Sequence, residues 1–180
     1  PLYSSAASDV YKRQVHCFLD GRDVPERSAT GFLEETLGVI EEKGVGRVAS
    51  MVGRYYAMDR DTNWGRTRKA YDLLTLGEGR KENDPFEALE QAYAEHPELT
   101  DYYVEPIVLT REDGTPVATV DDGDAFILWN YRSDRARQIT YALTRDEFTG
   151  FRRRKAPDVF YACMSVYDQN LDLPAAFTPH

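Results

Sequence analysis

Arginine side chains follow three separate apolar segments of the sequence. Arg22 comes after residues 15–19, Arg54 and Arg60 after residues 48–52, and Arg132 and Arg135 after residues 126–129. Arginine is permanently charged, and its planar guanidinium can bind two oxygens of a carboxylate or phosphate at once. If the apolar segments are strands of an open α/β sheet, their carboxyl ends gather these groups at a ligand-binding crevice. The pattern therefore predicts a small, highly anionic ligand, such as a phosphorylated hydroxy acid.

Aspartates beside these arginines leave a second interpretation open. They are Asp20, Asp23, Asp59, Asp61 and Asp134. If every arginine pairs with its own neighbour, the ion pairs are purely structural. Alternatively, the carboxylates orient the guanidinium groups toward a ligand. Asp23 could donate or accept a proton at a ligand hydroxyl, or it could be a plain hydrogen-bond acceptor that orients the ligand.

The elements that would position these side chains alternate between strands and helices. Residues 15–19 and 48–52 are short apolar runs, and residues 28–43 between them have helical spacing, which together indicate a βαβ unit with parallel strands. Ser28 or Thr30 could cap this helix, and Gly44 could end it. Further helices are expected at 64–76, 85–95 and 134–143, and further buried strands at 126–129 and 159–164.

The segment around Asp113-Gly114 predicts a β-hairpin, with arms at residues 104–109 and 117–120. Ser133 is a candidate cap for the helix over 134–143, and Asp84-Pro85 is a typical helix start. The predicted fold class is therefore α/β: a layered, mixed, mostly parallel sheet flanked by helices, with one β-hairpin.

Composition bounds the class of protein. The 180 residues are 42% hydrophobic and 29% charged, with a formal net charge of -9. The apolar content excludes collagen-like and disordered chains, and the acidic balance argues against binding to nucleic acid or to an anionic membrane. Two cysteines, Cys17 and Cys163, are too few for a disulfide framework and favour a cytoplasmic protein. The sequence has no GxGxxG, GxxxxGK[ST] or GxSxG motif.

The first fourteen residues, PLYSSAASDVYKRQ, have no apolar periodicity. Residues 4–14 match one reading frame of a sequencing adapter, so residues 1–14 are predicted to be a non-native tail. A natural disordered tail is the alternative. Residues 15–180 then form part of one domain, and we expect native sequence to be missing at both ends.

Two segments carry a specific resemblance to a known family. GRYYAMDRD at residues 53–61 and NYRSDRA at residues 130–136, supported by HCFLDGRDVPERSA and DVFYACMSVYD, resemble the cofactor-independent (2,3-bisphosphoglycerate-independent) phosphoglycerate mutases. The resemblance extends from residue 15 to about residue 179. In that family, an alkaline-phosphatase-like domain holds two manganese ions and a serine that becomes phosphorylated. A second, phosphotransferase domain holds the glycerate.

The resemblance implies that this chain is part of the phosphotransferase domain of an enzyme that interconverts 3-phosphoglycerate and 2-phosphoglycerate. It implies substrate contacts for Arg22, Asp23, Arg54, Arg60, Arg132 and Arg135, with Asp23 as the candidate catalytic residue. The implied partner is the metal-binding phosphatase-like domain of the same polypeptide, in a protein expected to be a monomer.

The resemblance also implies what lies outside this chain. The serine nucleophile and every ligand of the two Mn²⁺ ions belong to the absent domain, and the enzyme has no requirement for 2,3-bisphosphoglycerate. We therefore expect the chain alone to be inactive. The alternatives are a stand-alone module that captures a phosphorylated acid, a related phosphatase or phosphomutase of the same superfamily, and an inert domain whose arginines are paired internally.

Overall fold

The computed structural model describes residues 13–178, and residues 1–12 and 179–180 lie outside the described part. Most of the predicted tail, residues 1–14, therefore falls outside it, and its non-native origin stays a prediction. Its last residue, Gln14, begins the first strand and pairs with Arg47 of the next strand.

A four-stranded sheet forms one half of the described molecule. Its strands are β1 (Gln14–Leu19), β2 (Arg47–Gly53), β3 (Arg80–Glu82) and β4 (Ile107–Leu109), in the spatial order β1-β2-β4-β3. Helix α2 (Ala29–Lys43) connects β1 to β2, which run parallel, so the predicted βαβ unit is confirmed. Strand β4 lies antiparallel to β2 and parallel to β3, and this pairing makes the sheet mixed.

A second sheet has three parallel strands: β5 (Ala125–Leu128), β6 (Phe160–Ser165) and β7 (Ala175–Phe177). The strands that we expected in one layered sheet are thus divided between two. The prediction that residues 126–129 are buried is wrong for half of the strand, because Ile127 is 60% and Trp129 79% exposed. Only the face that carries Leu128 packs into the core.

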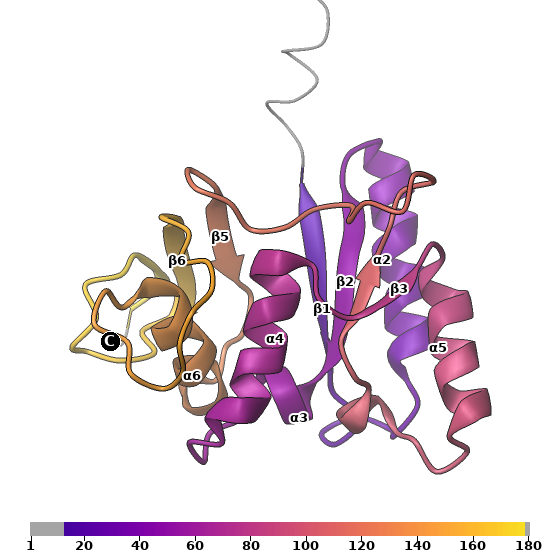
Figure 1. The fold of residues 1–180 in the computed structure, drawn as a ribbon, viewed down its shortest axis with the longest axis horizontal. Coiled ribbons are helices and arrows are strands. Elements are labelled where there is room, and N and C mark those ends of the chain that lie inside the picture. The colour runs from indigo at the N-terminus through magenta and orange to yellow at the C-terminus, as the bar shows by residue number, and fades with distance from the viewer. Residues whose placement is uncertain (1–12, 179–180) are drawn as a thin grey trace, which may run out of the picture.

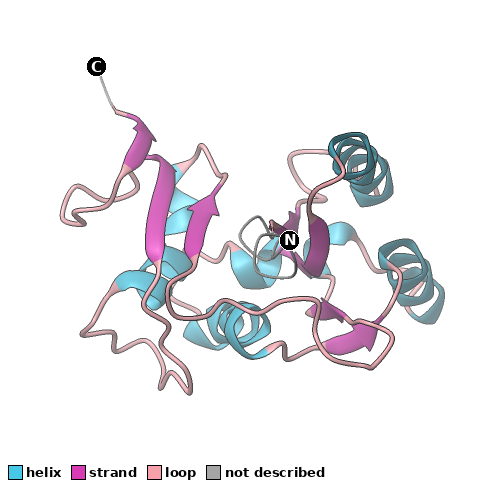
Figure 2. Ribbon diagram, turned by 90° about the horizontal axis from the view of Figure 1, so that it is seen from above, coloured by secondary structure: helices cyan, strands magenta, loops and turns pink. Residues whose placement is uncertain are grey.

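Helices cover the four-stranded sheet on both faces (Figures 1 and 2). Helix α2 and helix α5 (Pro85–Glu95) enclose an apolar core on one face, where Leu33, Met51 and Leu89 meet. Helix α4 (Trp64–Leu76) covers the other face, and its core continues to helix α6 (Ser133–Thr144) and the second sheet. The shared core of α4 and α6 therefore joins the two sheets. No helix in residues 13–178 is long and apolar enough to cross a membrane.

The start of α2 shows a cap that the sequence did not reveal. Ser28 occupies the expected cap position, but its side chain makes no capping hydrogen bond. The backbone N–H groups of Ser28 and Ala29 instead donate to Oδ2 of Asp101, at 2.8 Å each. Asp101 begins the 3₁₀ helix η1 (Asp101–Tyr103) and is 1% exposed. Gly44 ends α2 in the left-handed conformation with φ 63°, as predicted.

The expected β-hairpin is reduced to a turn. A single antiparallel bridge joins Thr110 to Pro116, and residues 117–120 form no strand. The N–H of Val117 still donates to Leu109, but that of Val120 donates to the carbonyl of Leu74 at the end of α4. The second arm therefore does not pair along the sheet, because its last residue forms a hydrogen bond with the C-terminal end of α4 instead.

Candidate functional site

The turn after β1 is built around Gly21 and Asp20. Gly21 has φ +64°, and a Cβ there would lie 2.7 Å from the backbone nitrogen of Tyr102, so this position requires glycine. Oδ1 of Asp20 accepts the backbone N–H groups of Arg22 and Asp23, at 3.2 Å each. The Asp20 carboxylate therefore fixes the backbone that presents Arg22 and Asp23.

The end of β2 packs against the same segment. A Cβ on Gly53 would lie 2.4 Å from the carbonyl oxygen of Tyr102, and the Gly53 N–H donates to Val104 at 2.8 Å. The chain then enters the short helix α3 (Arg54–Ala57), whose first residue, Arg54, is 2% exposed. The close backbone contact at Gly53 thus brings the buried Arg54 beside the turn after β1.

The segment after β5 leads into α6. Arg132 occupies the cap position of this helix and Ser133 is its first residue, so the prediction that Ser133 caps the helix is wrong. Asp134 and Arg135 follow in the first turn of α6, and Arg135 is buried. The third arginine-bearing segment is therefore held on a helix rather than on a free loop.

Three of the predicted arginines, Arg54, Arg60 and Arg132, lie in one network of ion pairs. Arg54 donates to Oδ2 of Asp23 at 2.8 Å, and the same oxygen lies 3.8 Å from Nη1 of Arg132. Arg132 also contacts Oδ2 of Asp134 at 3.1 Å, and Arg60 donates to that oxygen at 2.7 Å. The carboxylates are thus shared between segments that follow different strands. Except for Arg132 with Asp134, the arginines do not pair with the aspartates nearest them in sequence.

Arg54 and Arg135 keep unused hydrogen-bonding capacity. Nη1 of Arg54 also pairs with Asp20, and Nη1 of Arg135 donates to the carbonyl of Met58 at 3.0 Å. The Nε atoms of both arginines are buried, and neither has a hydrogen-bond partner among the described residues. A buried N–H group without a partner is costly, so these donors are suited to an added acceptor.

The network is also rich in positive charge. Burial lowers the pKa of Arg135, and the neighbouring charges of Arg54 and Arg60 lower it further. Neighbouring positive charges repel each other, and a bound anion relieves this repulsion. The arrangement can therefore bind a small anion with several oxygens.

Asp23 is held in its ionised form. The hydrogen bond from Arg54 lowers the pKa of Asp23 below its usual value, and the charges of Arg54, Arg132 and Arg135 act in the same direction. The Asp23 carboxylate can accordingly accept hydrogen bonds at neutral pH.

Arg22 stands apart from the other predicted residues. Its side chain is exposed, and within residues 13–178 no ion pair joins it to the network. Only its backbone contact with Asp20 ties it to the site.

Two residues that support the site were missed at the sequence level. Gln138 lies three positions after Arg135, on the same side of α6, and it bonds to Asp59 and to the backbone of Thr62. Helical spacing could have pointed to it. Asp101 gives no sequence signal, because its partners at the start of α2 are more than 70 positions away.

The chain does not supply a metal site in its described part. Among residues 13–178, no group of three or more His, Cys, Asp or Glu side chains could hold a metal ion. The residues described therefore do not fit the two manganese ions that the family resemblance implies, and no chemical step is derived through a metal.

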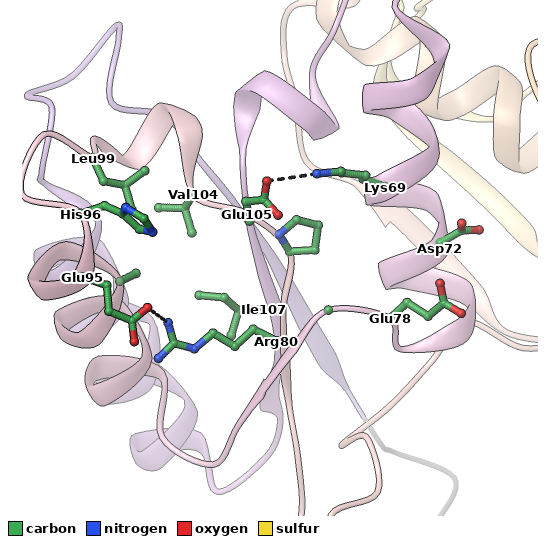
Figure 3. A pocket seen from close by; sticks show the side chains of 13 residues that line it. Lys69, Asp72, Glu78, Arg80, Glu95, His96, Leu99, Val104, Glu105 and Ile107 are labelled. Atoms are coloured by element: carbon green, nitrogen blue, oxygen red, sulfur yellow. Dashed lines mark hydrogen bonds and ion pairs between the residues drawn. The ribbon is translucent and has the colours of Figure 1, made fainter.

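A separate cavity of about 510 Å³ lies between α4, β3 and α5 (Figure 3). None of the predicted substrate residues lines it. Two pairs of its charged side chains neutralise each other, Lys69 with Glu105 at 3.0 Å and Arg80 with Glu95 at 2.8 Å. The arginine network, with its shared carboxylates and unused donors, is therefore the better candidate for an anion site.

Fold and site together define a class: an α/β protein that gathers guanidinium groups from the segments following β2 and β5. Comparison with known proteins makes this specific. The model of the family described as "BPG-independent PGAM N-terminus" matches residues 2–169, and the chain belongs to this family.

Relatives agree with this membership. A 2,3-bisphosphoglycerate-independent phosphoglycerate mutase 2 of Methanosarcina acetivorans is 48% identical over 169 residues, which cover 93% of this chain and 32% of the relative. The corresponding protein of Moorella thermoacetica is 44% identical, over 97% of this chain and 35% of its own length. The chain thus spans about a third of the length of these relatives.

A solved structure has the same fold. The crystal structure of Leishmania mexicana phosphoglycerate mutase at low cobalt concentration matches with a TM-score of 0.83 and 35% identity, covering 92% of this chain and 31% of that chain. The predicted α/β fold class is therefore confirmed.

Proposed function

We propose that this chain is the part of a 2,3-bisphosphoglycerate-independent phosphoglycerate mutase that holds the glycerate of 3-phosphoglycerate and 2-phosphoglycerate. The observation that carries the proposal is the sharing of Asp23 and Asp134 between arginines of different segments. The names of the relatives supply the reaction.

The proposed mechanism rests on positioning and charge neutralisation. Arg54, Arg60, Arg132 and Arg135 bind the carboxylate and phosphate oxygens of the substrate. The phosphoryl group moves to a residue elsewhere in the polypeptide, the guanidinium groups keep the glycerate bound, and the phosphoryl group returns to the other hydroxyl. Retention of the glycerate is this chain's contribution, because loss of it would turn an isomerisation into a hydrolysis.

Asp23 is proposed to act on the glycerate hydroxyls. Because its pKa is lowered by the hydrogen bond from Arg54 and by the surrounding arginines, the carboxylate stays ionised and can accept a hydrogen bond from a hydroxyl. The same shift makes Asp23 a weaker base, so a role in proton transfer depends on the substrate crowding the carboxylate. Arg22, which presents its exposed side chain beside Asp23, is proposed to add a further contact with the substrate once the rest of the polypeptide is present.

A chimera tests the proposal. Residues 15–178 replace the matching third of the Methanosarcina acetivorans relative, and the conversion of 3- to 2-phosphoglycerate is measured with and without Arg60→Ala. The Arg60 side chain is 45% exposed in this structure, and the proposal requires that the substrate and the rest of the polypeptide bury it. We then expect the change to lower kcat/KM by about 30-fold or more, since truncating one partner of a buried, hydrogen-bonded charge pair costs about 2 kcal/mol or more.

The matched control is Arg152→Ala, at an exposed arginine between α6 and β6, which should leave kcat/KM within about twofold. The 180-residue chain alone should give no turnover. Equal kcat/KM for the Arg60→Ala chimera and its parent would refute the proposal, and so would robust turnover by the chain alone.

A further inference from the structure

Asp59 is a buried carboxylate that receives an unusual number of hydrogen bonds. Its side chain is 3% exposed. Oδ2 accepts the backbone N–H groups of Asp61 at 3.1 Å and Asn63 at 2.8 Å, and Oδ1 accepts the Asn63 side chain at 3.0 Å and Arg66 at 3.2 Å. These bonds fold the segment that carries Arg60 around one carboxylate.

Gln138 connects this carboxylate to α6. Its Nε2 donates to Oδ2 of Asp59 at 2.9 Å and to the hydroxyl of Thr67 at 2.9 Å, and its Oε1 accepts the backbone N–H of Thr62 at 2.6 Å. Gln138 is 5% exposed, and these three side-chain hydrogen bonds all go to the α3–α4 segment or to α4 itself. The Gln138 amide thus connects helix α6, which packs with the second sheet, to the loop between α3 and α4, which follows strand β2 of the first sheet.

The bridge has the geometry to set the spacing of the arginines. On α6, Gln138 lies one turn after Asp134 and Arg135, so the three side chains share one side of the helix. Across from them, Met58 accepts from Arg135 and Arg60 donates to Asp134. Asp59 lies between Met58 and Arg60 in the chain, so its hydrogen bond to Gln138 fixes how residues 58–60 align with helix α6.

The charge of Asp59 is stable in this setting. Burial raises the pKa of Asp59, but the hydrogen bonds from Asn63, Gln138 and Asp61 outweigh it and leave the pKa below its usual value. Neutralising the carboxylate would leave several buried donors competing for one oxygen.

We propose that Asp59, acting through Gln138, is a positioning residue that holds Arg60 against Asp134 and Arg135 at the substrate site. The proposal rests on the function proposed above. It assigns Asp59 no contact with substrate: the residue acts only through the guanidinium groups that it places.

The test is a double-mutant cycle in the chimera with 3-phosphoglycerate as the probe. Asp59→Asn should raise KM about tenfold with a smaller change in kcat, because the arginines bind the substrate in its ground state. In the Arg60→Ala background, Asp59→Asn should raise KM by less than about twofold, since the residue through which it acts is gone.

A second variant guards against a loss of folding. Gln138→Met keeps the volume and leaves the bonds of Asp59 within its own loop, and it should raise KM in the same way as Asp59→Asn. Melting curves report the folded fraction, and loss of folded protein alone lowers kcat and leaves KM unchanged.

Three outcomes would overturn the inference. These are an unchanged KM in Asp59→Asn, an unchanged KM in Gln138→Met, and effects of Asp59→Asn and Arg60→Ala that multiply as independent changes do. If Arg60→Ala raises KM and Asp59→Asn does not, only the positioning role fails. If Arg60→Ala leaves both KM and kcat unchanged, this inference and the proposed function fail together.

Discussion

Replacing the buried arginine at the centre of the network is the most informative perturbation of the site. Arg54 is 2% exposed and pairs with the carboxylates of Asp20 and Asp23, whose side chains are 33% and 53% exposed. Arg54→Met retains most of the volume and removes the charge and the donors. Water can reach the two orphaned carboxylates, so the free energy of unfolding should fall by less than the roughly 3–5 kcal/mol typical of a broken buried pair.

The cost to catalysis should be larger than the cost to folding. In the chimera, we expect Arg54→Met to remove about 2–4 kcal/mol of transition-state stabilisation, which is a fall in kcat/KM of about 30- to 1000-fold. A coupled assay for 2-phosphoglycerate measures this fall, chemical denaturation measures stability on the same preparation, and Arg152→Met is the control. A fall in kcat/KM of threefold or less in a folded variant would contradict a role of Arg54 in binding the substrate.

Three further changes test how the fold supports the site. Gly53→Ala should destabilise the chain by about 2 kcal/mol or more, because its Cβ would lie 2.4 Å from the backbone of Tyr102; a melting temperature equal to that of the parent would contradict the close contact. Asp101→Ala should cost about 2–4 kcal/mol in denaturant unfolding, since it orphans two N–H groups at the start of α2, and a cost below about 1 kcal/mol would contradict the cap. Burial lowers the pKa of His16 to about 4, below its value in the unfolded chain. The contribution of the neutral imidazole to the free energy of unfolding is therefore fully present above about pH 6.5 and is lost as the pH falls to 4. His16→Asn should flatten the stability profile between pH 4 and 6.5, and an unchanged slope would count against a half-buried, neutral histidine.

Local signals in the sequence predicted much of the fold. The helices at 64–76 and 85–95 have the predicted bounds, because apolar spacing, the Asp84-Pro85 start and the terminal Gly77 all act over short distances. The carboxylate of Asp84 accepts the N–H groups of Phe86 and Glu87, as a capping residue should. The parallel pairing of β1 and β2 followed from the helix between them.

Contacts between distant residues could not be predicted in the same way. The strands divide between two sheets because the core of α4 and α6 joins them, and no local pattern encodes that packing. Likewise, the second arm of the expected hairpin leaves the sheet because Val120 bonds to the end of α4. Strand β3 (Arg80–Glu82) was missed because its three residues are all charged and lack the apolar pattern of a strand.

The candidate site shows the same division. The positions of the arginines after the apolar runs indicated where charge would gather. Arg54, Arg60 and Arg132 do lie in one network of ion pairs, and Arg135 lies near enough for the charges of Arg54 and Arg60 to lower its pKa. Which aspartate pairs with which arginine depended on the tertiary arrangement, and Arg60 pairs across to Asp134 rather than with its neighbours. A role for these residues in substrate binding stays a prediction.

The position of the substrate is best tested by a crystal structure of the chimera with bound 3-phosphoglycerate. We expect carboxylate or phosphate oxygens of the ligand to lie within about 3.2 Å of guanidinium nitrogens of Arg54, Arg60, Arg132 and Arg135. We also expect the Nε atoms of Arg54 and Arg135 to gain acceptors. A ligand bound in the cavity between α4 and α5, with no contact to these four arginines, would contradict the proposed function.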